Sequence, residues 1–176
     1  MIVVAPLTPG ADTVAALAEL LVATVAAGGS VSFMDPLDPA VAADYWRAGL
    51  QRVAEGGRVI LGARVDGGVR VDGVLAGTIT LDPCPWPNQP HRADLAKLMV
   101  TPRFRGQGIA RALVLAAEAE AKARGRWLLT LDTAADGGAA GLYESLGYVP
   151  CGRIPDFALK PQGGLTDTLF FYKRLE

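Results

Sequence analysis

The most constraining feature of this chain is a short glycine-containing segment, residues 105–110 (RGQGIA), at the junction of two regular patterns. The apolar run 95–100 (LAKLMV) before it is typical of a strand, and the alanine-rich residues 107–124 after it are typical of a helix. The two glycines remove side chains where backbone N–H groups could approach a ligand closely. A helix start adds unpaired N–H donors and the positive end of the helix dipole. The segment therefore predicts a site for an anion such as pyrophosphate.

Known phosphate-binding patterns narrow the choice of ligand. A P-loop would need Gly-Lys-Ser/Thr where this chain has GIA, so that pattern is excluded. A dinucleotide fingerprint would need a small residue in place of Arg111 and a shorter turn after the strand. One feature still favours the dinucleotide fingerprint. The next strand-like run, residues 128–131, ends at Asp132, roughly where that fingerprint has the acidic residue that binds the ribose. An NAD(P)-dependent oxidoreductase therefore stays open as an alternative.

A third pattern, R-x-x-G-x-A from Arg105 to Ala110, resembles the coenzyme A pyrophosphate loop of the GNAT superfamily of N-acetyltransferases. Residues 98–102 (LMVTP) resemble that family's L-x-V-x-P strand end, and residues 139–148 (AAGLYESLGY) its A-x-x-L-Y-x-x-x-G-F helix and strand. The motifs occur in the family's order and spacing, within a resemblance that covers residues 92–176. In the N-terminal half, residues 29–37, Tyr45-Trp46 and residues 91–94 look like the tabtoxin-resistance type of GNAT enzyme.

The remaining patterns predict one domain, residues 1–176, with element order β-α-α-β-β-β-α-β-α-β-β. Thr8 with Pro9, and Asp38 with Pro39, read as helix starts, and glycine pairs at 28–29 and 56–57 as helix ends. We expect strands at residues 2–4, 59–65, 73–81, 95–100, 128–131 and 168–172, a turn at 66–68, a proline-rich loop at 82–90 and a long loop at 155–166. The resemblance implies a GNAT fold: mixed α/β, with a central mixed sheet, helices on both faces and a splay between the fourth and fifth strands.

Composition excludes several classes of function. A net charge of −1 argues against a general nucleic-acid binder, and no apolar run is long enough to span a bilayer. The first residues lack the basic region of a signal peptide. The cysteines, Cys84 and Cys151, show no metal or redox spacing, and a single histidine excludes a histidine-cluster metal site. We expect no metal, a cytoplasmic location, no membrane or nucleic-acid partner, and a monomer or homodimer.

The resemblance implies acetyl-CoA as cofactor, with coenzyme A as product. Its pantetheine arm is expected along the backbone of Leu98, Met99 and Val100. Its pyrophosphate is expected at Arg105, Gly106, Gln107, Gly108, Ile109 and Ala110. Asp136 stands where the family often has an asparagine that contacts the cofactor arm. An ionised carboxylate accepts but does not donate hydrogen bonds, which leaves this contact open.

For catalysis, the resemblance places the hydroxyl of Tyr143 near the thioester sulfur, where it could assist the departing thiolate. The alternative is a tyrosine that only packs in its helix. Asp94 is expected to take the proton of the incoming ammonium, directly or through a water shared with Asp132, and alternation would place it on the face of Leu98. The alternatives are an Asp94–Arg92 surface pair and a helix-capping Asp132.

Acceptor specificity is expected from two loops, and direct transfer is expected because Cys151 is not marked as a nucleophile. The candidate acceptor-binding residues are Met34, Asp35, Trp86, Asp156 and Phe157. The alternative for each is an ordinary loop residue, which is the commoner case. The leading hypothesis is an N-acetyltransferase acting on a primary amine of a small molecule. The tabtoxin-resistance likeness points to a toxin, antibiotic or amino-acid-like amine. A non-catalytic acyl-CoA-binding module is a further alternative.

Overall fold

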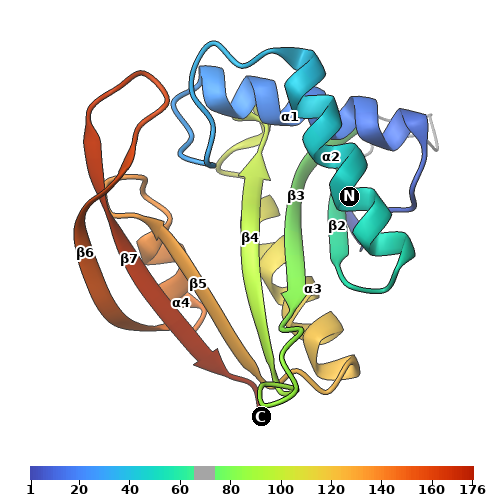
Figure 1. The fold of residues 1–176 in the computed structure, drawn as a ribbon, viewed down its shortest axis with the longest axis vertical. Helices are drawn as coiled ribbons and strands as arrows, with labels where there is room; N and C mark the ends of the chain where they lie inside the picture. The colour runs from blue at the N-terminus through green and yellow to red at the C-terminus, as the bar shows by residue number, and fades with distance from the viewer. Residues whose placement is uncertain (66–73) are drawn as a thin grey trace.

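A computed structural model describes residues 1–65 and 74–176, which form one mixed sheet with helices on both faces (Figure 1). The sheet order is β1-β2-β3-β4-β5-β7-β6. The strands are β1 (Ile2–Pro6), β2 (Val59–Val65), β3 (Val74–Pro83), β4 (Arg92–Val100), β5 (Leu128–Ala134), β6 (Val149–Leu159) and β7 (Leu165–Arg174). The helices are α1 (Ala11–Ala26), α2 (Pro39–Ala54), α3 (Ile109–Ala123) and α4 (Ala140–Ser145), with a 3-10 turn, η1, at Pro102–Phe104. The expected element order is confirmed.

Two apolar layers hold the helices against the sheet. Leu17 of α1 and Trp46 of α2 pack with Ile60 on one face. On the other face, Leu113 of α3 packs with Leu61. Ile60 and Leu61 are neighbours in β2 and enter opposite layers, as strand alternation requires. Each such large side chain, once fully buried, contributes about 1.5–3 kcal/mol.

The predicted helix boundaries are confirmed where local chemistry sets them. The Asp38 carboxylate accepts a hydrogen bond from the Ala40 N–H at 2.7 Å, with Pro39 as the first helical residue. Gly28 and Gly56 follow α1 and α2 with φ of 82° and 75°. The expectation that Thr8 caps α1 is wrong. The Leu7 N–H donates to the Ile60 carbonyl at 2.8 Å, so the chain is still tied to β2 there, and the helix begins only after Gly10.

Several strands run further than predicted, and β3 is the one that enters the proline-rich segment. β3 continues through Pro83, which pairs with Ala93. The Cys84 N–H donates to the Arg92 carbonyl of β4, so an N–H at residue 83 would point away from β4, toward the side of β2. β2 starts only at Val59, opposite Leu81, and does not reach the level of residue 83. A missing N–H therefore costs the ladder nothing there.

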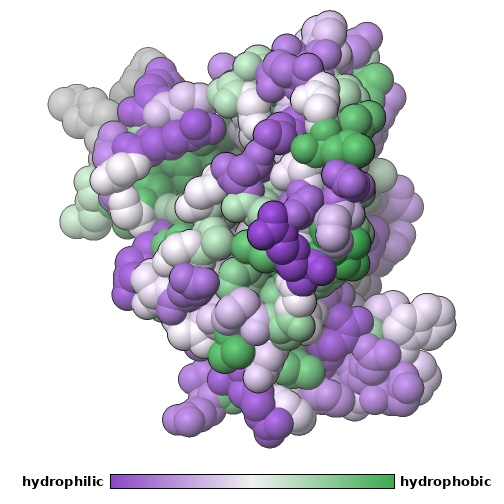
Figure 2. Space-filling model, turned by 90° about the vertical axis from the view of Figure 1, so that its left-hand side faces the viewer, coloured by the Kyte–Doolittle hydropathy of each residue, from purple (hydrophilic) through white to green (hydrophobic). Residues whose placement is uncertain are grey.

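The loop predicted at residues 155–166 is wrong, because β6 and β7 form a long hairpin across that range. Pro155 is accommodated at an irregularity, where the register with β7 shifts between Ile154 and Ala158. β6 is the last strand in the sheet order and leaves apolar side chains such as Val149 and Ile154 exposed. Figure 2 views the molecule from the side on which β6 lies in Figure 1 and shows hydrophobic residues scattered among hydrophilic ones. The turn predicted at residues 66–68 lies outside the described residues.

The sheet divides between β4 and β5, as predicted. The two strands pair in parallel only at Arg92↔Leu128, Ala93↔Leu129 and Asp94↔Thr130, after which they diverge (Figure 1). β4 carries a bulge just beyond this point. Thr80 of β3 pairs with Ala96 and Thr78 with Met99, so β4 holds one residue more than β3 over this stretch.

The bulge corrects one expectation. Leu98 packs in the same layer as Ala93 and Leu95, so Asp94 and Leu98 lie on opposite faces of β4, not on the same face. No described helix is long and apolar enough to cross a membrane.

Candidate active site

Two adjacent cavities lie where β4 and β5 separate. The larger has a volume of about 620 Å³ and the smaller about 210 Å³. They share a wall of small and apolar residues from the α1–α2 connection, β4, β5 and the start of α4. The shared residues are Ser30, Val31, Leu98, Thr133, Ala134 and Ala139. A molecule in one cavity would therefore lie directly against a molecule in the other.

The larger cavity is bordered by the two ends of the segment predicted to bind an anion. Arg105, Ala110 and β4 residues Leu98, Met99 and Val100 line it. Gly108 is the residue before the first turn of α3, has a φ of 81° and carries no side-chain cap, so the first N–H groups of the helix stay available.

A side chain at Gly106 or Gly108 would enter open space, since no atom lies within 4 Å of the ideal Cβ position at either residue. That open space before a helix start suits a phosphate group. Two of the expected residues have side chains that are engaged elsewhere. Ile109 is 1% exposed and packs in the core, so its side chain is not available to a ligand. The Gln107 side chain donates to the Arg103 carbonyl at 3.5 Å.

Asp136 lines the larger cavity, where its carboxylate accepts hydrogen bonds from neighbouring side chains. It forms an ion pair with Lys160, and Thr166 Oγ1 donates to it at 2.8 Å. The hydrogen bond from Lys160, and next that from Thr166, lower the pKa of Asp136. Its carboxylate therefore stays ionised and cannot replace an asparagine amide as a donor. Lys160, which lines the same cavity, was not anticipated from the sequence.

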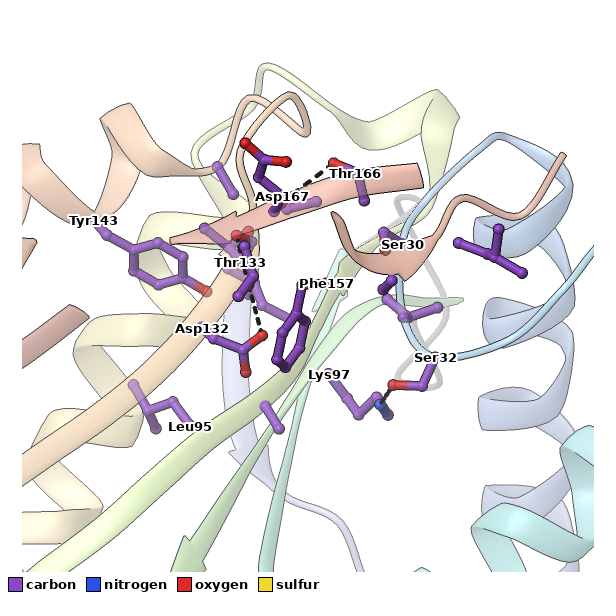
Figure 3. A pocket seen from close by; sticks show the side chains of 18 residues that line it. Ser30, Ser32, Leu95, Lys97, Asp132, Thr133, Tyr143, Phe157, Thr166 and Asp167 are labelled. Carbon is purple, nitrogen blue, oxygen red and sulfur yellow. Dashed lines mark hydrogen bonds between the residues drawn. The ribbon is translucent and has the colours of Figure 1, made fainter. Parts of the chain in front are cut away.

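The smaller cavity brings together Tyr143, Asp132 and Lys97 (Figure 3). Burial, and next the charge of Asp132, raise the pKa of Tyr143 to about 12, so its hydroxyl stays protonated at neutral pH. Asp132 accepts a hydrogen bond from Thr168 Oγ1 at 2.9 Å. Asp132 lies within β5, which runs to Ala134, and does not cap a helix. Two of the three residues predicted for catalysis therefore meet here.

Asp94, the third residue predicted for catalysis, lines neither cavity. It lies in the short stretch where β4 and β5 still pair. Arg92 Nη1 donates to its carboxylate at 2.5 Å, and Thr130 donates to the same oxygen. This arrangement matches the alternative in which Asp94 forms a surface pair with Arg92.

Lys97 was missed as a site residue. Its Nζ donates to Ser32 Oγ at 2.9 Å, and both residues line the smaller cavity. The signal in the sequence was a single charge inside the apolar strand run 95–100. Alternation alone gives no reason to place that charge in a cavity, because the bulge decides its direction.

Of the predicted acceptor-binding residues, the structure brings Phe157 into the smaller cavity, where its ring packs edge-on against Phe170 at 6.0 Å. Asp156, next to it, lines neither cavity and donates its N–H to Asp167 at 3.0 Å. Met34 and Asp35 lie in the α1–α2 connection without lining either cavity. Trp86 is 63% exposed in the β3–β4 loop, at the end of the sheet where β4 begins.

Comparisons with known proteins agree with this fold. The model of the acetyltransferase (GNAT) family matches residues 35–148. A ribosomal-protein-alanine N-acetyltransferase from Brucella melitensis has a TM-score of 0.78 and 22% identity, over 99% of each chain. An N-acetyltransferase from Staphylococcus aureus Mu50 has a TM-score of 0.77 and 19% identity, again over 99% of each. A Salmonella typhimurium protein assigned as an acetyltransferase, solved with its cofactor acetyl-CoA, has a TM-score of 0.76 and 18% identity, over 99% of this chain and 94% of that one.

Proposed function

The chain belongs to the GNAT acetyltransferase family, and on that premise we propose that it moves the acetyl group of acetyl-CoA to a primary amine of a small molecule by direct attack. The observation that carries this proposal is the wall shared by the two cavities, with Tyr143 in the lining of the smaller one. The larger cavity would hold the donor and the smaller one the acceptor. When bound, acetyl-CoA supplies the acetyl group as a thioester.

The residues of the larger cavity would bind and orient the donor. The first N–H groups of α3 and the Arg105 guanidinium would hold its pyrophosphate. β4 has no pairing with β5 beyond Asp94, so those backbone amides of Leu98–Val100 that point away from β3 would be free to bind the arm and to polarise the thioester carbonyl. Open space at Gly106 and Gly108 supports this assignment, because no side chain blocks the approach.

Two side chains would move protons. The Tyr143 hydroxyl, kept protonated by its raised pKa, would donate to the departing thiolate. Asp132 would take a proton from the acceptor ammonium, through water where the distance requires it, because an amine with a pKa of about 10.4 is protonated at neutral pH. Asp94 is left out of this scheme on account of its place outside both cavities.

The experiment is a thiol-release assay with acetyl-CoA and a panel of primary amines. Tyr143→Phe should lower kcat on the order of 10- to 100-fold while acetyl-CoA affinity stays within a few-fold, because only the hydroxyl is lost. Asp132→Asn should lower kcat most at low pH and recover as more acceptor arrives neutral. Tyr172→Phe, at a tyrosine outside both cavities, is the matched control and should keep full activity.

The results separate the alternatives. Acetyl-CoA binding without thiol release for any amine would indicate a non-catalytic acyl-CoA-binding module. Full turnover by Tyr143→Phe would reassign Tyr143 to packing. A thermal shift with NADH but none with acetyl-CoA would revive the oxidoreductase alternative. The likeness to tabtoxin-resistance enzymes stays a prediction that the same amine panel tests.

A further inference from the structure

Lys97 presents a cation inside the proposed acceptor cavity. Figure 3 shows its side chain beside Ser32 on one side of the cavity, with Asp132 and the Tyr143 ring on the other. Its Nζ donates to Ser32 Oγ at 2.9 Å and lies 5.8 Å from the centre of the Tyr45 ring of α2. One hydroxyl and one ring hold the ammonium in place, and neither carries a negative charge that would pair with it.

The bulge in β4 is what aims this cation at the cavity. With regular alternation, Lys97 would lie on the face of Ala93 and Leu95, which are buried in the apolar layer beneath α3. The extra residue puts Leu98 in that layer instead and releases Lys97 to the opposite face. Lys97 has a φ of 53°, a conformation that is uncommon for a residue with a side chain and is found often where function requires a fixed direction.

The charges around the cavity do not neutralise one another. Asp167, which lines it, is paired with Arg153 at 2.6 Å. In the part of the chain that the structure describes, no ion pair includes Lys97 or Asp132. The cavity therefore offers one positive and one negative charge on opposite sides, neither of them held in an ion pair among the described residues.

The burial of Lys97 also favours an anion beside it. Burial, and next the nearby Arg58 guanidinium, lower the pKa of Lys97, while Asp132 and Asp82 oppose that shift. Arg58 itself is held by Asp82 through two hydrogen bonds of 2.7 and 2.8 Å, so it is not free to serve as the binding group. A ligand anion at Lys97 would offset the cost of burying its charge.

We propose that Lys97 binds an anionic group of the acceptor while Asp132 faces its amine, so that the acceptor is a small amine that also carries an acid group. α-Amino acids and their phosphonic or phosphinic analogues share this chemistry. The cavity volume of about 210 Å³ is below the usual range for drug-sized ligands and suits a molecule of this size. The proposal rests on the proposed N-acetyltransferase function.

The test compares matched acceptors and matched variants. A set of α-amino acids is assayed against the primary amide of each, which keeps the amine and side chain but lacks the acid. The wild-type protein should prefer the acid in kcat/KM by about 10- to 100-fold, as expected for hydrogen bonds to a charged partner. Lys97→Met should remove this preference by raising KM for the acids far more than KM for the amides. Lys97→Arg should retain part of it.

Lys122→Met, on the exposed side of α3 and outside both cavities, is the control and should keep the preference. Thermal unfolding verifies that each variant is folded. Calorimetry of the acids against the protein saturated with coenzyme A adds a readout without turnover, in which Lys97→Met should lose the same 10- to 100-fold in affinity.

The outcomes distinguish the two proposals. Equal use of acids and amides, unchanged by Lys97→Met, would overturn the role of Lys97 and leave the acetyltransferase proposal intact. Absence of thiol release with every amine would count against the acetyltransferase proposal. In that case the calorimetry still tests the anion site: if Lys97→Met binds the acids as tightly as the wild-type protein does, Lys97 does not bind the acid group.

Discussion

At the scale of single residues, Tyr143 shows that packing and a chemical role are compatible in one side chain. Its ring packs against Tyr148 and Phe171, at centroid distances of 5.5 and 5.9 Å, as the purely structural alternative requires. Its hydroxyl end nevertheless faces the smaller cavity (Figure 3). The same burial that fixes the ring raises the pKa of the phenol, so packing produces the proton donor that the proposed reaction needs.

This pKa predicts the shape of the pH–rate profile. With a Tyr143 pKa of about 12, the neutral phenol persists throughout the range from pH 7 to pH 10.5. We expect kcat to rise to a plateau, as more acceptor amine becomes neutral, and not to fall again before the upper end of that range. The measurement is the profile for wild type and Tyr143→Phe with saturating acetyl-CoA. An alkaline limb near pH 10 that disappears in the variant would show that Tyr143 titrates normally.

At the scale of elements, α3 has glycines of the same conformation at both ends but a cavity at only one. Gly108 precedes the helix with a φ of 81°, and Gly125 follows it with a φ of 69°. In both places an added side chain would meet open space, so the cost of substitution comes from the backbone conformation alone. The pair separates the effect of backbone strain from the effect on ligand binding.

We expect Gly108→Val to abolish detectable acetyl-CoA binding and Gly125→Val to retain it, with similar losses of stability in the two variants. A β-branched side chain at 108 would occupy the path of the phosphates, whereas residue 125 lies at the far end of the helix. Calorimetric titration with acetyl-CoA, beside urea unfolding of each variant, makes the comparison. Unchanged affinity in Gly108→Val would contradict the pyrophosphate site.

The elements also show what the sequence could predict. Residue-level signals sufficed where a structure is local: the Asp38 cap, the strand at residues 59–65 and the glycine-containing loop before α3. These signals failed where pairing with a strand far away in the sequence determines the local structure. The β4 bulge depends on register with β3, and the β6–β7 hairpin absorbs Pro155 at a register shift that no rule for single residues contains. The direction of Lys97 and the face of Leu98 relative to Asp94 were therefore not predicted correctly.

At the scale of the whole molecule, the two halves of the sheet are connected at both ends of the gap between β4 and β5. Strand pairing connects them at one end, and hydrogen bonds between loops connect them at the other. Three residue pairs connect β4 to β5. At the other end, the Asp35 N–H donates to the Pro161 carbonyl at 3.0 Å and Gln162 Nε2 donates to the Val25 carbonyl at 3.2 Å. The α1–α2 connection thus meets the β6–β7 hairpin above the gap (Figure 1). A ligand in the larger cavity would contact both halves.

Acetyl-CoA should therefore stabilise the whole fold. At one hundred times its dissociation constant, linkage predicts about 2.7 kcal/mol of added stability. For a chain of this size that corresponds to a rise in Tm of roughly 5–10 °C. Thermal unfolding with acetyl-CoA, coenzyme A and NADH measures it. A shift with NADH that equals the shift with acetyl-CoA would contradict coenzyme A specificity.

The wall that the two cavities share has a kinetic consequence. Because Leu98, Thr133 and Ala139 border both spaces, donor and acceptor would be resident on the protein at the same time. Cys151, an exposed thiol, lies outside both cavities and would not relay the acetyl group. Initial-rate lines at several fixed donor concentrations should then intersect, as for a ternary complex, where a ping-pong reaction would give parallel lines.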